Sequence, residues 1–107
     1  MAEVTPLNSH SEFQILINSG QVVIVIFWDT RGGPCRFIIP IFEKLASDPQ
    51  FSSIKFVKVD VDEQEEISQE CGIRALPTAM VFKDGEKMDE LTHPDLKGLY
   101  DLFQKHA

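Results

Sequence analysis

A chain of 107 residues, 43% of them hydrophobic, is long enough for one domain with one core and too short for two. We therefore expect a single domain over residues 1–107. Its formal net charge of −7 argues against nucleic acids and anionic membrane surfaces as partners. The sequence starts without a basic segment followed by an apolar one, and two cysteines make no disulfide framework. These features predict a cytoplasmic protein with free thiols.

The first quarter of the chain predicts a short strand, a helix and a buried strand. A short edge strand is expected at residues 4–5. Ser9 and Glu12 have the spacing of a capping box, and the apolar residues that follow predict a helix over residues 9–19. Residues 22–28, VVIVIFW, form an unbroken apolar run that predicts a strand buried on both faces. This run is far too short to cross a bilayer.

The segment that begins at Pro34 has helical spacing. Proline suits a first helical position, where the missing N–H costs nothing. Pro40 should kink this helix, and Asp48 followed by a proline should end it. Cys35 is then expected in the first helical turn, just beyond the carboxyl end of the buried strand. Open α/β sheets place ligand sites there, and a helix start favours a thiolate.

The rest of the chain predicts three more strands and two more helices. In chain order we expect a strand at residues 54–61, an acidic helix at 63–71, strands at 78–82 and 86–91 joined by an Asp84-Gly85 turn, and a helix through Leu96, Leu99, Tyr100, Leu102 and Phe103. The order, βαβαβ followed by ββα, predicts an α/β fold. Its central sheet is mixed and is flanked by helices on both faces.

Several segments resemble the thioredoxin family, and most closely its small eukaryotic cytosolic members, such as those of fungi. FWDTRGGPCR at residues 27–36 resembles the family signature FWATWCGPCR, and Pro40 falls where the family has a helix-kinking proline. FVKVDVDE at residues 56–63 resembles the third strand, GIRALPT at 72–78 the cis-proline motif, and FKDGEKMDEL at 82–91 the final hairpin. The resemblance implies the thioredoxin fold and a role in protein-disulfide reduction. There the first cysteine attacks as a thiolate and the second resolves the mixed disulfide.

The resemblance fails at the reacting atoms. Gly32 stands where the family has its attacking cysteine, and Cys35 matches the resolving one. Arg31 replaces a tryptophan that flanks the substrate. We therefore expect dithiol–disulfide exchange to be lost or strongly impaired.

Two further departures lie away from the cysteines. Ile26 replaces an aspartate that the family buries, and Lys58 thereby loses its expected partner. The segment LTHPD at residues 91–95 is shorter than the family's corresponding loop, which helps to line the substrate groove. Several independent changes together are typical of a site that has abandoned catalysis.

The predicted substrate groove is better preserved than the thiol chemistry. The resemblance implies that Pro77 is cis and that the backbone of Leu76 pairs with an extended substrate strand. The groove residues are Trp28, Arg31, Gly33, Pro34, Leu76 and Pro77. Its implied partners are protein disulfides or peptides, with thioredoxin reductase or glutathione as further candidates. The chain is expected as a monomer or a weak dimer.

Several alternatives stay open from the sequence. The chain is a monothiol enzyme that uses Cys35 with glutathione, a non-catalytic peptide-binding module, or an engineered variant of an active thioredoxin. Cys35 itself is a low-pKa thiolate, a buried inert thiol, or half of a disulfide with Cys71. The three histidines are scattered along the sequence, so we predict no metal and no other cofactor.

Overall fold

The computed structural model describes residues 4–31 and 33–107. Its strands form one mixed sheet in the order β1-β3-β2-β4-β5. They are β1 (Thr5–Pro6), β2 (Val23–Trp28), β3 (Lys55–Asp60), β4 (Thr78–Lys83) and β5 (Glu86–Thr92). β1, β2 and β3 run parallel, whereas β4 is antiparallel to both β2 and β5. This confirms the predicted mixed sheet, parallel at first and antiparallel at the end.

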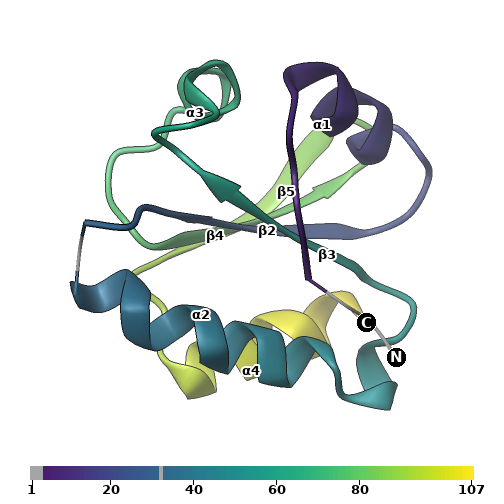
Figure 1. The fold of residues 1–107 in the computed structure, drawn as a ribbon. Coiled ribbons are helices and arrows are strands. Elements are labelled where there is room, and N and C mark those ends of the chain that lie inside the picture. Colours follow the sequence, from purple (N-terminus) through teal and green to yellow (C-terminus); the bar gives the residue numbers. More distant parts are fainter. Residues whose placement is uncertain (1–3, 32) are drawn as a thin grey trace.

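Helices cover both faces of the sheet (Figure 1). They are α1 (His10–Ile17), α2 (Gly33–Ala46), α3 (Glu65–Cys71) and α4 (Leu96–His106), with a short 3₁₀ turn, η1 (Pro49–Phe51), after α2. α1 and α3 lie on one face, and α2 and α4 on the other. None of the helices in the described part of the chain is long and apolar enough to cross a membrane.

β2 lies at the centre because its residues are apolar on both sides of the strand. Ile24 and Ile26 face the core beneath α2 and α4, whereas Val23, Val25 and Phe27 face the core beneath α1 and α3. All five side chains are fully buried. A strand between two covered faces must be apolar throughout, so the unbroken run in the sequence correctly predicts this position.

Aromatic rings fill much of the core beneath α2 and α4. Phe103 of α4 contacts Phe42, Phe51 and Phe56, with ring centroids 5.4, 5.4 and 4.7 Å apart. Two of these pairs are edge-to-face, the arrangement that the charge distribution of aromatic rings favours. This cluster ties α4 to α2 and to the sheet, and so fixes the helix that carries Cys35.

Local signals place most element ends correctly. Ser9 caps α1 by accepting the N–H of Glu12 at 3.1 Å, as the capping spacing predicts. Asp84 and Gly85 both have positive φ angles, as the β4–β5 turn requires. α2 begins at Gly33, one residue before the predicted start, and the 3₁₀ turn after α2 is not predicted at all.

Candidate functional site

The end of β2 and the start of α2 together position Cys35. β2 ends at Trp28, and after a short loop Cys35 lies in the first turn of α2, as predicted. β4 runs antiparallel to β2, with Phe27 opposite Thr78. Pro77, the residue before β4, therefore lies at the same end of the sheet as Cys35. The loop before Cys35 and the loop that carries Pro77 meet at this end (Figure 1).

The thiol of Cys35 is buried, and the pKa of this thiol is raised. Cys35 is only 3% exposed. Burial raises the pKa of its thiol, a backbone hydrogen bond with Asp29 opposes this shift, and the charge of Asp29 adds to it. A helix start alone would favour the thiolate. Burial outweighs that effect here, so Cys35 lacks both the charge and the access that a nucleophilic cysteine needs.

A cavity of about 280 Å³ lies beside Cys35. Its described lining consists of Trp28, Asp29, Thr30, Cys35, Arg36, Ile39 and Pro40. Sequence reasoning does not identify Arg36, Ile39 and Pro40 as lining residues. The available signal is helical spacing, since Ile39 follows Cys35 by one turn of α2.

This cavity is separate from most of the predicted groove. Trp28 and Cys35 belong to both, but among the described residues Arg31, Gly33, Leu76 and Pro77 do not line the cavity. Gly32 falls outside the described residues. For Pro34 the structure gives the backbone, which belongs to α2.

The loop before β4 carries Leu76 and Pro77. The Leu76–Pro77 bond is cis, as predicted. Pro77 is buried, and its carbonyl oxygen accepts the N–H of His93 at 2.9 Å. The side chain of Leu76 packs against the core beneath α1 and α3. Among the described residues, the backbone N–H and C=O of Leu76 have no hydrogen-bond partner.

Arg31 and Gly33 flank this end of the sheet from the other side. Arg31 is 73% exposed, and its Nη2 lies 3.5 Å from Asp29 Oδ2 and 3.1 Å from Asp62 Oδ1. It thereby joins the loop after β2 to the loop after β3. Gly33 is exposed, and a Cβ built on it would meet no atom within 4 Å. The surface beside Cys35 thus carries a paired cation where the family resemblance implies an aromatic flank.

Lys58 forms an ion pair that the sequence does not predict. Its Nζ lies 3.3 Å from Glu43 Oε2 and 6.0 Å from the centroid of the Trp28 ring. Ile26 is fully buried at the position where the resemblance implies an aspartate. Burying an isoleucine avoids the desolvation cost of a buried carboxylate. The charge that Lys58 requires comes from α2 instead.

Trp28 contributes to both the core and the cavity. It is half-buried, and its indole Nε1 is buried without a hydrogen-bond partner among the described residues. The two roles predicted for Trp28, core aromatic and site flank, are therefore compatible.

The second cysteine stands apart from Cys35. Both cysteines are free, so the alternative of a Cys35–Cys71 disulfide is not realised in this structure. Cys71 ends α3 half-buried, and burial raises the pKa of its thiol to about 12. Residues 4–31 and 33–107 contain no group of three or more His, Cys, Asp or Glu side chains placed to hold a metal ion.

The mixed sheet, the two helices on each face, and a cis-proline loop at the end that carries Cys35 define the thioredoxin fold. The family model of thioredoxin matches residues 4–104. The chain therefore belongs to the thioredoxin family of oxidoreductases, as the sequence resemblance predicts.

Individual proteins show the same relationship. A thioredoxin from Coprinus comatus is 47% identical over 102 residues, which cover 95% of this chain and 96% of the relative. The crystal structure of Malassezia sympodialis thioredoxin superposes with a TM-score of 0.95 at 40% identity, covering 99% of this chain and 92% of that one. A structure concerning thiol resolution in a yeast mitochondrial 1-Cys peroxiredoxin via glutathione/thioredoxin systems has a TM-score of 0.87 at 29% identity, covering 95% and 94%.

Proposed function

We propose that this chain binds extended protein segments at Leu76 and does not sustain dithiol–disulfide exchange. The observation that carries this proposal is the state of Cys35, which is 3% exposed and has a raised pKa. Gly32, at the position of the family's attacking cysteine, has no side chain to supply a second thiol. We place the protein in the cytoplasm, where two free cysteines remain reduced.

The chemistry of exchange requires two thiols in sequence. A thiolate attacks one sulfur of the target disulfide, forms a mixed disulfide and expels the other sulfur as a thiolate. A second thiol must then attack the mixed disulfide to release the reduced target. Cys71 lies at the end of a different helix, α3, and its thiol has a pKa of about 12. A thiol that stays protonated at neutral pH is unsuited to this second step. Cys35 by itself cannot complete the cycle.

Binding needs only the backbone of the cis-proline loop. An extended peptide that pairs with a free peptide group gains main-chain hydrogen bonds without covalent chemistry. Leu76 offers both an N–H and a C=O for this purpose, whereas the carbonyl of Pro77 already accepts from His93. We therefore assign Leu76 as the pairing residue, with Trp28, Arg31, Gly33, Pro34 and Pro77 around it.

A monothiol activity with glutathione is the second candidate. The cavity beside Cys35 favours it, because Cys35 is one of the residues that line this space of about 280 Å³. In that reaction the Cys35 thiolate attacks a target disulfide and expels one target sulfur as a thiolate. Glutathione then attacks the target sulfur of the mixed disulfide, which releases Cys35 as a thiolate and leaves the target bound to glutathione. A second glutathione attacks that disulfide, so the target is fully reduced and oxidised glutathione leaves. The burial of Cys35 opposes the first step, which is why we rank binding above it.

Reduction of insulin disulfides distinguishes the two candidates. We would compare the wild type, Cys35→Ser and Gly32→Cys, each with and without glutathione and with a reductant that recharges thiols. The binding proposal expects equal rates for the wild type and Cys35→Ser in both conditions. A wild-type rate above that of Cys35→Ser would instead establish Cys35 as a working nucleophile.

The Gly32→Cys variant tests whether the missing thiol alone prevents exchange, or whether the other differences from the family pattern also do. If it reduces insulin, the absent cysteine alone accounts for the lost exchange. If it remains inactive, Ile26, Arg31 or the short loop at residues 91–95 also prevents turnover. Far-ultraviolet circular dichroism of each variant checks that the fold is intact.

A further inference from the structure

We infer that His93 is a positioning residue for peptide binding at Leu76. The hydrogen bond from the His93 N–H to the Pro77 carbonyl, here called the latch, joins the cis-proline loop to the segment that follows β5. This inference rests on the proposed function, because it identifies the residue that keeps Leu76 in place for pairing. It arises from an unusual backbone conformation at His93.

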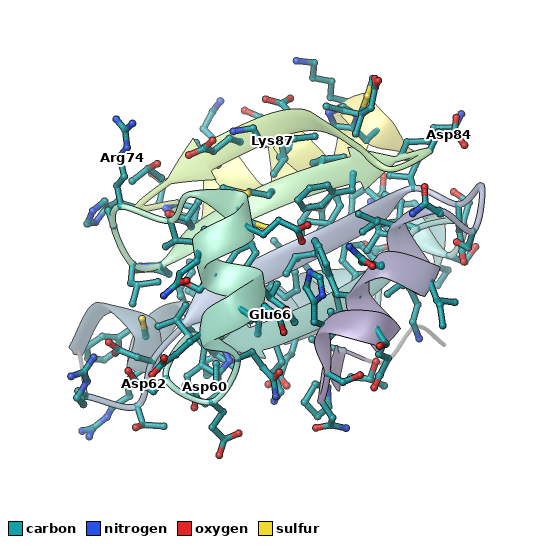
Figure 2. All side chains as sticks on the ribbon, turned by 90° about the horizontal axis from the view of Figure 1, so that it is seen from above. Asp60, Asp62, Glu66, Arg74, Asp84 and Lys87 are labelled. Carbon is teal, nitrogen blue, oxygen red and sulfur yellow. The ribbon has the colours of Figure 1, made fainter. Side chains whose placement is uncertain are left out.

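His93 has a left-handed backbone, with a φ of +51°. Among the described residues, Asp84 is the only other non-glycine residue with a positive φ, at +52°. The β4–β5 turn requires that conformation at Asp84. Figure 2 shows Asp84 at one end of the sheet and Arg74, which precedes Leu76 by two residues, at the other. The hairpin turn therefore does not explain the conformation of His93.

The latch extends the pairing of β4 and β5 by one residue. Thr78 lies opposite Thr92, and the next residues outward are Pro77 and His93. The N–H of His93 donates to the Pro77 carbonyl at 2.9 Å. Pro94 follows and has no N–H, so the segment after β5 cannot continue the ladder.

The latch decides which backbone groups stay available to a bound segment. Pro77 has no N–H, and its carbonyl oxygen is occupied by His93. Among the described residues, the N–H and C=O of Leu76 have no hydrogen-bond partner. A segment that pairs with this loop must then use Leu76, so the latch favours one register of pairing over its neighbour.

Two features of the sequence oppose the latch. A side chain with a Cβ disfavours the left-handed conformation. A residue before a proline also prefers an extended backbone, and His93 precedes Pro94. Elsewhere the chain adopts a positive φ at glycines, which are Gly20, Gly72 and Gly85.

The surroundings of His93 maintain this conformation. Pro94 is buried, and so is Pro77 on the other side of the latch. Asp95 then caps α4 by accepting the N–H of Gly98 at 2.7 Å. The imidazole itself is exposed, with no hydrogen-bond or ion-pair partner in the described part of the chain. Strained backbone that its surroundings hold in place is typical of ligand-binding sites, and here it lies beside Leu76.

Substitutions at position 93 should change the stability of the latch in a graded way. Glycine takes the left-handed conformation without strain, asparagine tolerates it about as well as histidine, and a β-branched valine tolerates it least. The fraction of molecules with a closed latch should be highest in His93→Gly, unchanged in His93→Asn and lowest in His93→Val. Hydrogen exchange of the residue-93 amide, followed by NMR and corrected for the intrinsic rate of each variant, measures this fraction.

Peptide affinity should follow the closed fraction. The probe is a pool of fluorescein-labelled nonapeptides of randomised sequence without cysteine, and fluorescence anisotropy measures its affinity. If only the closed form binds, the apparent affinity falls in proportion to the closed fraction. His93→Val should therefore bind about fivefold or more weakly than the wild type, matching its loss of closed fraction. His93→Asn should match the wild type, and His93→Gly should bind at least as tightly.

Asp48→Ala is the control for a general loss of stability. Asp48 caps the 3₁₀ turn after α2 by accepting the N–H of Gln50 at 3.0 Å. Because α2 begins at the end of the sheet that carries Cys35, this turn lies at the far end, away from Leu76. Losing the cap should destabilise the fold, as urea unfolding would show, and should leave peptide affinity unchanged.

Several results would overturn the inference, and they are distinguishable from a failure of the proposed function. Amide protection that does not change across the series refutes the strained latch. Wild-type affinity in a His93→Val variant that has lost protection, or an equal loss of affinity in Asp48→Ala, refutes its role in binding. Equal weakening in His93→Asn and His93→Val would assign recognition to the imidazole instead. Failure of the pool to bind the wild type refutes peptide binding itself.

Discussion

The thiol of Cys71 holds its proton more tightly in the folded protein than in the unfolded chain. Burial raises its pKa from 9.0 to about 12, the charge of Glu70 adds to the shift, and Lys87 opposes it. Above pH 9 the unfolded chain releases this proton while the folded protein keeps it. The free energy of unfolding must therefore fall as the pH rises from about 9 towards 12.

We expect Cys71→Ala to flatten this alkaline loss of stability. The wild type should lose up to about 1.4 kcal/mol of unfolding free energy per pH unit from Cys71 above pH 9, a contribution that the variant lacks. Urea unfolding at pH 8, 9 and 10 measures the difference, with Ser68→Ala on the same helix as the control. Parallel pH profiles for the wild type and Cys71→Ala would contradict the raised pKa.

At the residue scale, the sequence predicts roles that depend on chain neighbours. Ser9 caps a helix three residues before Glu12, and Cys35 follows directly from the strand and helix around it. The ion pair of Lys58 and Glu43 joins β3 to α2, and needs the packing of one on the other. No local pattern contains that information, so the pair appears only in the structure.

Helix α3 ends on a residue that requires glycine. Gly72 has a φ of +67°, and its N–H bonds to the carbonyls of Ser68 and Gln69. We expect Gly72→Ala to lower the free energy of unfolding by about 1 kcal/mol, because a Cβ disfavours this left-handed conformation. No atom lies within 4 Å of that Cβ, so the cost is conformational and not steric.

Gly33→Ala is the matched control for this prediction. Gly33 also has open space around its Cβ position, but it lies in α2 and has no positive φ. Alanine there should leave stability unchanged or raise it, since alanine is the better helix former. Thermal and urea unfolding of both variants would decide, and an equal loss in the two would show that backbone conformation is not the cause.

The end of α4 is tethered to β5 by one carboxylate. Asp89 Oδ2 accepts from Lys105 Nζ and from His106 Nε2, each at 3.0 Å. The hydrogen bond from His106 and then that from Lys105 lower the pKa of Asp89 from 3.8 to about 2. Because the pKa of Asp89 is lower in the folded protein than in the unfolded chain, the ionised carboxylate stabilises the fold at pH values above about 3.8. This stabilisation is lost as the pH falls through about 2.

Asp89→Asn should therefore destabilise the protein by about 1 kcal/mol at pH 7. The difference from the wild type should narrow as the pH falls from about 4 towards 2, as urea unfolding at pH 7, 4 and 3 would show. Asp101→Asn, which breaks only the exposed pair with Lys97, should have little effect at any of these values. A pH-independent loss in Asp89→Asn would instead point to packing.

At the element scale, hydrophobic periodicity and the positions of glycine, proline and capping residues predict the helices and strands but not all of their ends. β3, expected at residues 54–61, spans Lys55–Asp60, and α3, expected at 63–71, spans Glu65–Cys71. The 3₁₀ turn Pro49–Phe51 depends on the burial of Phe51 in the core beneath α2 and α4. A short polar-flanked segment carries no sign of that burial in its sequence.

The whole molecule depends on the aromatic cluster around Phe103. This ring is fully buried and contacts three other phenylalanines. We expect Phe103→Ala to cost about 3–5 kcal/mol, a large part of the roughly 5–15 kcal/mol that stabilises a typical domain. Urea unfolding followed by Trp28 fluorescence measures the loss.

Phe37→Ala makes the same chemical change on the surface. Phe37 is 73% exposed, so its removal should barely alter stability. Similar losses in the two variants would mean that the ring cluster does not carry the stability assigned to it.

At the scale of the molecule, the order of elements alone predicts the architecture, because it restricts the sheet to very few topologies. The distribution of charge at the site, in contrast, cannot be predicted from the order of elements. The three arginines are separated by up to 43 residues in sequence, which is the distance from Arg31 to Arg74. Only the folded sheet brings their loops to one end.

The central place of β2 also determines how this protein would aggregate. Residues 22–28 are uncharged, free of proline and rich in β-branched side chains, the composition that stacks into cross-β fibrils. Folding places this segment between β3 and β4. The two edge strands are poor templates for pairing with another chain, since β1 contains Pro6 and β5 is largely charged. Fibril formation should therefore start from unfolded chains, and a variant that loses stability should aggregate sooner even with its binding surface intact.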